Sequence, residues 1–214
     1  MNNELLKRIL SSLILIPLVF FFIFKGSYLF IFFILIVYLI TLYEWHFLSL
    51  KKNYYLPGFV FISFSFYTFY YLRIEGYFYL FLLVILTCIS TDIGGYTFGK
   101  ILKGPKITKI SPNKTYSGML GSFSLSIIFL IILKSNTDLF LLIKNESLAY
   151  LNIFILALII SFVSQLGDLI ISYFKRKSNI KNTGEILPGH GGLLDRIDGM
   201  LFAFPFTYLL IKML

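Results

Sequence analysis

The sequence has 214 residues, of which 58% are hydrophobic and only 14% are charged. A water-soluble domain carries about 25% charged residues, so the composition excludes soluble enzymes, disordered linkers and secreted disulfide scaffolds and predicts an all-α, polytopic membrane protein. The net charge of +9 would suggest nucleic acid in a soluble protein, but in a membrane protein it indicates cytoplasmic loops and anionic headgroups, so no nucleic-acid partner is expected.

Uncharged runs predict about seven transmembrane helices packed as a bundle. In chain order they cover residues 9–24, 26–43, 53–72, 76–91, 115–133, 147–167 and 199–211. The first run lacks a small-residue cleavage site, so we expect a retained helix and not a signal peptide. The last run is too short to span a bilayer unless its helix extends back through residues 193–198.

Polar residues next to these runs are expected to mark helix ends. Glu44 is expected at the water boundary after the second run, with Trp45 in the aromatic belt of the interface. Asp92 is expected to end the fourth run. Marking the end of this helix could be the only role of Asp92.

Basic residues concentrate in two loops. One loop carries Lys100, Lys103, Lys106, Lys109 and Lys114, and the other carries Lys175, Arg176, Lys177 and Lys181. The positive-inside rule places both loops and the N-terminus in the cytoplasm. We therefore expect a multi-pass protein of the bacterial cytoplasmic membrane, with its active site facing the cytoplasm.

Asp168 stands inside a long uncharged segment. A carboxylate at the bilayer centre costs about 3 kcal/mol, so its helix must bury it against protein or present it to a polar cavity. The side chains that share its helix face are polar: Ser161, Ser164, Gln165 and Ser172. Such a stripe indicates either hydrogen bonds between helices or the wall of a hydrophilic site.

Asp195 and Asp198 are three residues apart, so they project from one helical face. Together with Asp168 they predict oxygen ligands for a hard divalent cation such as Mg²⁺, which usually keeps waters and substrate phosphates. Two histidines and one cysteine do not favour a zinc site. Asp198 could instead pair with Arg196 or cap a helix.

Hydroxyls and glycines accompany the basic loops. Ser111, Asn113, Lys114 and Thr115 precede a helix, whose N-terminal amides and dipole favour anions. In the second loop, glycines flank His190 and permit close backbone approach and unusual dihedral angles. Each loop alone could simply set the topology. Taken together with the aspartates, the two loops predict a site for a phosphate-rich ligand with metal ions.

The segment from Ser172 to Asp198 resembles the signature of phosphatidate cytidylyltransferases, also called CDP-diacylglycerol synthases. The residues that carry the resemblance are Ser172, Lys175, Arg176, Lys181, Gly184, Leu187, Pro188, His190, Gly191, Gly192, Asp195, Arg196 and Asp198. The resemblance covers roughly residues 87–205. It departs at Asn182, where the family usually has Asp, and at Tyr116 and Ser117, where it usually has Trp and Glu.

The resemblance implies transfer of a cytidylyl group from CTP to phosphatidic acid, giving CDP-diacylglycerol and pyrophosphate. The residues expected to be catalytic are Asp168, Lys175, Arg176, Asp195 and Asp198, the three aspartates as ligands of Mg²⁺ and of a possible second cation. The residues expected to bind substrate are Asp92, Ser111, Asn113, Lys114, Thr115, Ser172, Lys181, His190, Gly191, Gly192 and Arg196. One membrane domain is expected, with hydrophobic spans in 1–84 and a catalytic half in 85–214, and the resemblance alone suggests a homodimer.

Two other function classes share some of these features. A transporter or channel also places carboxylates in its helices, but here the charges gather at one face and no inverted repeat is evident. A CTP-using lipid or polyprenol kinase would need similar nucleotide and metal sites. The kinase would transfer the terminal phosphoryl group and release CDP in place of pyrophosphate.

Overall fold

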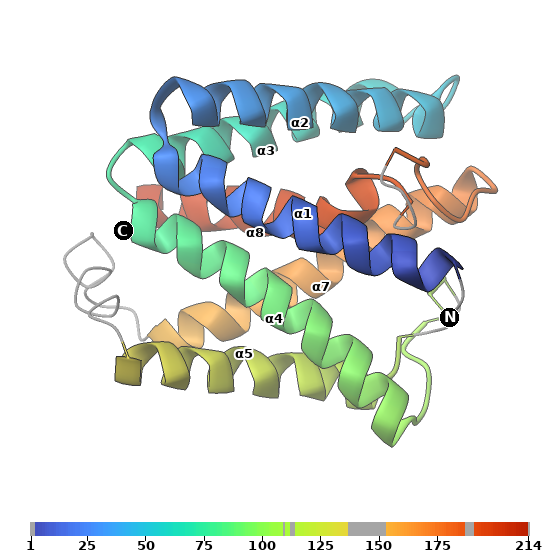
Figure 1. Ribbon diagram of the computed structural model, residues 1–214. Helices are drawn as coiled ribbons and strands as arrows, with labels where there is room; N and C mark the ends of the chain where they lie inside the picture. Colours follow the sequence, from blue (N-terminus) through green and yellow to red (C-terminus); the bar gives the residue numbers. More distant parts are fainter. Residues whose placement is uncertain (1–2, 109, 112–113, 137–152, 187–190, 214) are drawn as a thin grey trace. The chain divides into compact units, whose positions relative to one another are not determined.

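The computed structural model describes residues 3–108, 110–111, 114–136, 153–186 and 191–213, without the side chains of 3–12 and 134–136. The helices in these ranges (Figure 1) are α1 (Asn3–Lys25), α2 (Ser27–Ser49), α3 (Tyr55–Ile74), α4 (Phe78–Leu102), α5 (Tyr116–Asn136), α7 (Ile153–Lys177) and α8 (Leu194–Met213). One isolated bridge joins Lys106 to Thr115. The all-α prediction is therefore confirmed, and each predicted run falls on a helix, although residues 147–152 lie outside the described ranges.

Helix length and composition mark the chain as a multi-pass membrane protein. The described parts of α2, α4, α5 and α7 are each long and apolar enough to cross a bilayer, and α1 contributes a shorter apolar stretch from Leu13 to Lys25. The extension predicted for the last run is also confirmed, because α8 begins at Leu194.

The chain folds into two compact units. The first unit consists of Met1–Tyr70 and Phe174–Ile197, and the second consists of Tyr71–Tyr173 and Asp198–Leu214. Helices α3, α7 and α8 each begin in one unit and continue into the other.

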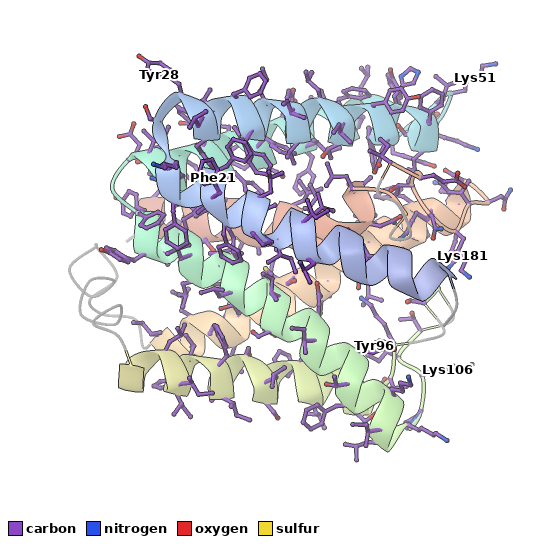
Figure 2. The ribbon with its side chains drawn as sticks, viewed as in Figure 1. Phe21, Tyr28, Lys51, Tyr96, Lys106 and Lys181 are labelled. Atoms are coloured by element: carbon purple, nitrogen blue, oxygen red, sulfur yellow. The ribbon has the colours of Figure 1, made fainter. Side chains whose placement is uncertain are left out.

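Aromatic and hydroxyl contacts join the helices of the first unit. The rings of Phe22 on α1 and Phe33 on α2 stack with their centroids 5.0 Å apart, and the hydroxyls of Tyr38 on α2 and Ser63 on α3 lie 2.8 Å apart. Figure 2 shows Tyr28 and Lys51 at the two ends of α2. Toward the Lys51 end, the hydroxyl of Ser178 donates to the carbonyl of Leu48 at 2.6 Å, which fixes the chain that follows α7.

Glycines bring α4 and α5 of the second unit into backbone contact. A Cβ atom added to Gly94 would lie 2.5 Å from the carbonyl oxygen of Gly121, and one added to Gly118 would lie 2.7 Å from that of Gly95. Small residues at helix interfaces allow this approach in membranes, where packing replaces the hydrophobic effect between helices.

Helices α7 and α8 also cross at glycines in the second unit. A Cβ atom on Gly167 would lie 3.0 Å from the carbonyl oxygen of Asp198, and one on Gly199 would lie 2.3 Å from the hydroxyl of Ser164. The crossing therefore sits beside Asp168, the residue that follows Gly167.

Three boundary predictions are wrong. Helix α2 continues to Ser49, and Glu44 is only 1% exposed instead of marking the water boundary. Trp45 is 3% exposed, packs edge-on against Phe174 and donates its indole N–H to the carbonyl of Tyr55, so it belongs to the core. Asp92 does not close a helix, because α4 runs on to Leu102 and leaves Asp92 on an exposed face.

We expect Gly94→Ala to lower the free energy of unfolding by about 1–3 kcal/mol, because the methyl group would force the α4 and α5 backbones apart. Equilibrium unfolding in mixed micelles would measure the change. Ile93→Ala, at the exposed neighbouring position, is the matched control and should stay close to the parent protein. Equal stability of the two variants would contradict the close packing of these helices.

Candidate functional site

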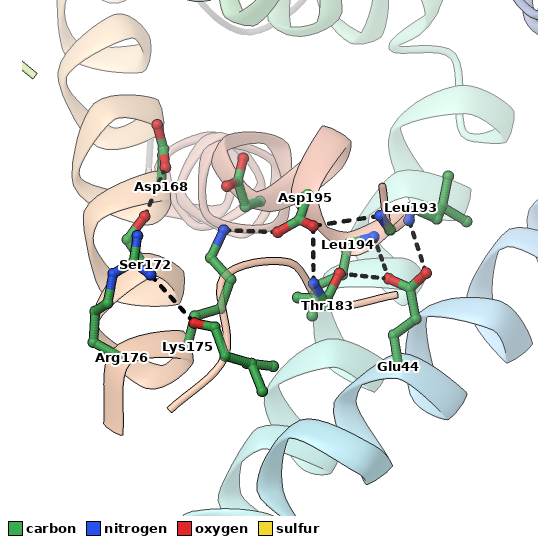
Figure 3. A network of polar contacts seen from close by, with 12 residues as sticks. Glu44, Asp168, Ser172, Lys175, Arg176, Thr183, Leu193, Leu194 and Asp195 are labelled. Atoms are coloured by element: carbon green, nitrogen blue, oxygen red, sulfur yellow. Dashed lines mark hydrogen bonds and ion pairs between the residues drawn. The ribbon is translucent and has the colours of Figure 1, made fainter. Parts of the chain in front are cut away.

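The carboxylate of Glu44 is the centre of a polar cluster in the first unit (Figure 3). Its Oε1 accepts a hydrogen bond from the backbone N–H of Leu193 at 2.8 Å, and its Oε2 accepts one from that of Leu194 at 2.7 Å. The hydroxyl of Thr183 donates to Oε2 at 2.9 Å. Glu44 thus binds the N-terminus of α8, where unpaired N–H groups and the helix dipole favour a negative charge.

Asp195 lies in the same cluster, in the first turn of α8. Its Oδ1 accepts a hydrogen bond from the ammonium group of Lys175 at 2.7 Å, with both side chains only 11–12% exposed. Its Oδ2 accepts from the backbone N–H of Thr183 at 2.9 Å and more weakly from that of Gly192 at 3.4 Å. The structure thus brings together Lys175 and Asp195, which the sequence assigns to catalysis.

Two glycines make room for these carboxylates. Gly191 has φ +86°, a backbone conformation that side chains rarely adopt. A Cβ atom on Gly192 would lie 2.0 Å from the hydroxyl of Thr183 and 2.7 Å from Oε2 of Glu44. The unusual dihedral predicted for this stretch is confirmed, and the close approach at Gly192 is to the protein's own side chains.

Asp168 is the centre of a separate polar cluster in the second unit. Its Oδ2 pairs with the ammonium group of Lys114 at 2.5 Å, and the two side chains are 30% and 24% exposed. The hydroxyl of Ser172, one turn later on α7, donates to its Oδ1 at 3.2 Å. Lys114 therefore neutralises a carboxylate in this structure and also reaches the carbonyl of Gln165.

The polar stripe on α7 divides into two parts. Toward the middle of the helix, Ser161 is fully buried and accepts a hydrogen bond from Thr91 of α4 at 2.8 Å. Ser122 of α5 in turn donates to the carbonyl of Thr91 at 2.7 Å. This part of the stripe joins helices. In the other part, the side chain of Asp168 is 30% exposed and Ser172 beside it is 7% exposed.

Asp198 is 8% exposed and accepts a hydrogen bond from the backbone N–H of Gly199 at 2.8 Å. It lies at the crossing of α7 and α8, beside Gly167. A buried carboxylate at this crossing, beside the glycine that precedes Asp168 on α7, has the chemistry expected of an oxygen ligand.

The first basic loop is held against the start of α5. Thr115 caps α5 by accepting from the N–H of Gly118 at 3.1 Å, and the N–H of Tyr116 is bound to the carbonyl of Pro105. Ser111 is also held locally, by hydrogen bonds to Thr108 and Lys114. Since these amides are used by the protein, the anion site expected here stays a prediction that rests on the side chains of the loop.

The other predicted residues fall into two groups. Arg176, Lys181 and Arg196 are exposed, and the guanidinium of Arg176 donates to the carbonyl of Ile180 at 3.3 Å. Asn113 and His190 lie outside the described residues.

Sequence reasoning missed Glu44 and Thr183. The same signal that singled out Asp168 was present at Glu44, since this carboxylate also stands between uncharged runs, 26–43 and 45–50. Thr183 lies inside the segment 172–198 but carries no charge, and only the folded loop reveals that it contacts both carboxylates.

The described residues contain no group of three or more His, Cys, Asp and Glu side chains arranged to hold a metal ion. Mg²⁺ is usually bound by only one or two carboxylates, with waters and substrate phosphates completing its shell. The carboxylate and hydroxyl oxygens of Asp168 and Ser172, with Asp198 at the adjacent helix crossing, are the kind of donors that such an ion prefers. The donor chemistry fits Mg²⁺ without a dedicated protein cage.

Comparison with known proteins relates the chain to cytidylyltransferases. A profile described as "Cytidylyltransferase family" matches residues 6–81 and 54–214. The chain is 39% identical over 125 residues to the phosphatidate cytidylyltransferase of Bacillus subtilis, a match that covers 58% of this chain and 44% of the relative. It is 37% identical over 155 residues to that of Staphylococcus epidermidis, covering 71% of this chain and 55% of the relative. The matches thus span about half the length of these relatives.

The Lys175–Asp195 pair should behave as one energetic unit. Removing either charge alone leaves the other buried without its partner, so Lys175→Met and Asp195→Asn should each lower the free energy of unfolding by about 3 kcal/mol. The double variant should lose clearly less than the sum.

Equilibrium unfolding in mixed micelles of the four proteins would measure this coupling. Lys181→Met, an exposed lysine of the same loop, is the control and should change stability by less than about 0.5 kcal/mol. Strictly additive effects of the two substitutions would contradict the ion pair.

Proposed function

Because the chain belongs to the cytidylyltransferase family, we propose that it transfers the cytidylyl group of CTP to phosphatidic acid, forming CDP-diacylglycerol and pyrophosphate in phospholipid biosynthesis. The observation that carries the proposal is the cluster of Lys175 and Asp195, set in the segment 172–198 beside the glycines at 191 and 192. That segment combines cations for phosphates with a carboxylate that the glycines allow to be held by backbone N–H groups.

The reaction itself explains why cations and carboxylates occur together. An oxygen of the lipid phosphate attacks the α-phosphorus of CTP, and the bond from that phosphorus to the bridging oxygen of pyrophosphate breaks. Both reactants are anions, so catalysis depends on neutralising charge and aligning the attacking and leaving oxygens. The phosphate nucleophile is already ionised at neutral pH and needs no strong general base.

The basic residues supply part of that neutralisation. We assign Lys175 and Arg176 to the lipid phosphate or to the departing pyrophosphate. Lys114, Ser111, Asn113 and Thr115 are assigned to the nucleotide. Lys114 and Lys175 each hold a carboxylate in the structure, and this pairing keeps the ammonium groups in place before the substrate phosphates arrive.

Asp168, Asp195 and Asp198 are assigned to cation binding as part of the same proposal. A Mg²⁺ ion there would neutralise phosphate charge and orient the leaving group. The protein's own contribution is to hold the carboxylates: Ser172 and Lys114 fix Asp168, and Lys175 and Thr183 fix Asp195.

The remaining substrate contacts are assigned from the resemblance to the family. They are Asp92, Ser172, Lys181, His190, Gly191, Gly192 and Arg196. A site on the cytoplasmic face of the bacterial cell membrane would meet CTP from the cytosol and phosphatidic acid from the lipid. The homodimer suggested by the resemblance stays a prediction.

The test is transfer of label from [α-³²P]CTP into lipid by the purified protein with phosphatidic acid. We expect labelled CDP-diacylglycerol that requires Mg²⁺, and a rate at least about 100-fold lower in Asp195→Asn, because a carboxylate assigned to the cation that would neutralise phosphate charge is lost. Glu185→Gln, the same kind of change at an exposed residue of the same loop, is the control and should keep the parent rate.

Absence of label in lipid, with folded protein and intact CTP present, would refute cytidylyl transfer and favour the transporter or the kinase. Full activity of Asp195→Asn would leave the reaction standing but remove Asp195 from its machinery.

A further inference from the structure

We propose that Glu44 is a positioning residue that holds one segment, residues 183–184 and 192–195, in its active conformation. Only the expected change in kcat rests on the proposed function. The structural claim is that a buried carboxylate on α2 fixes a loop and the start of a helix that lie about 140 residues later in the chain.

Among the described residues, every hydrogen-bond donor to the Glu44 carboxylate belongs to this segment. The three donors to its carboxylate are the hydroxyl of Thr183 and the amides of Leu193 and Leu194, at 2.7–2.9 Å. Gly184 also lies against it, since a Cβ atom there would be 2.9 Å from Oε1. A carboxylate that is 1% exposed would be costly without such donors, so the segment and Glu44 stabilise each other.

Thr183 links Glu44 to Asp195. Its hydroxyl donates to Glu44 while its backbone N–H donates to Oδ2 of Asp195 at 2.9 Å. Leu194, bound by Glu44, is the immediate neighbour of Asp195 on α8. Two routes therefore connect the buried glutamate to the carboxylate that pairs with Lys175, and neither route requires Glu44 to touch a substrate.

The carboxylate is chemically specific for this task. Both of its oxygens accept, Oε1 from Leu193 and Oε2 from Thr183 and Leu194. A glutamine has the same size, but whichever way its amide turns, its NH₂ group would face a backbone N–H. Glu44→Gln thus leaves at least one buried donor unpaired while preserving the packing of α2.

Amide hydrogen exchange and steady-state kinetics of Glu44→Gln test the proposal. We expect the amides of Thr183, Leu193 and Leu194 to exchange at least about tenfold faster, while those of α4 and α5 stay unchanged. We expect kcat to fall at least about tenfold and the KM for CTP to change by clearly less, because the main effect acts through Asp195 on the transition state.

Glu75→Gln, the same substitution at an exposed glutamate, is the matched control and should change neither measurement. If Glu44→Gln does not fold, Thr183→Val is the second variant, because it removes only the hydroxyl donor. It should change amide exchange and kcat in the same directions, by smaller factors. Unchanged amide exchange of the segment in a folded variant would overturn the proposal. Faster exchange with an unaltered kcat would also overturn it, because Glu44 would then only stabilise the fold.

The exchange measurement needs no substrate. If the parent protein transferred no cytidylyl group, the proposed function would fail, yet the exchange data would still decide whether Glu44 holds the segment.

Discussion

A carboxylate placed among apolar helices has to be surrounded by donors, and this constraint organises the polar part of the protein. Glu44 is bound by a hydroxyl and two backbone amides. Asp195 is bound by Lys175 and by the amides of Thr183 and Gly192. Asp168 is bound by Lys114 and Ser172. Each set includes at least one donor from a loop or from the end of a helix. The carboxylates thereby fix segments that apolar packing alone would leave loosely held.

Glycine makes these arrangements sterically possible. At Gly192 a side chain would collide with Thr183 and Glu44, and at Gly167 and Gly199 it would separate α7 from α8. The pairs on α4 and α5 serve the same purpose between spans, where small residues let backbones touch. Gly192, in the signature segment, is therefore required by the protein's own packing.

Hydrophobic runs were sufficient to predict every described helix, because a spanning helix must be continuously apolar over about 20 residues. They failed at the ends of α2 and α4, where Glu44 and Asp92 were read as boundaries although backbone hydrogen bonding lets a helix continue past a polar residue. Burial of Glu44 could not be predicted, since its donors lie in a loop far along the chain. The pairing of Lys175 with Asp195 also depends on how that loop folds, and charge spacing alone does not encode it.

The clusters around Asp168 and Asp195 share one chemical feature: in each, a lysine forms an ion pair with an aspartate, and a hydroxyl group lies nearby. This combination of groups suits the binding of several phosphates. The most direct test of their use in cytidylyl transfer is ³¹P NMR of the complete reaction of CTP, phosphatidic acid and Mg²⁺ with the purified protein. We expect pyrophosphate and the diphosphate resonances of CDP-diacylglycerol to appear in equal amounts. Formation of CDP with a newly phosphorylated lipid, or no change in the phosphorus spectrum, would contradict transfer at the α-phosphorus.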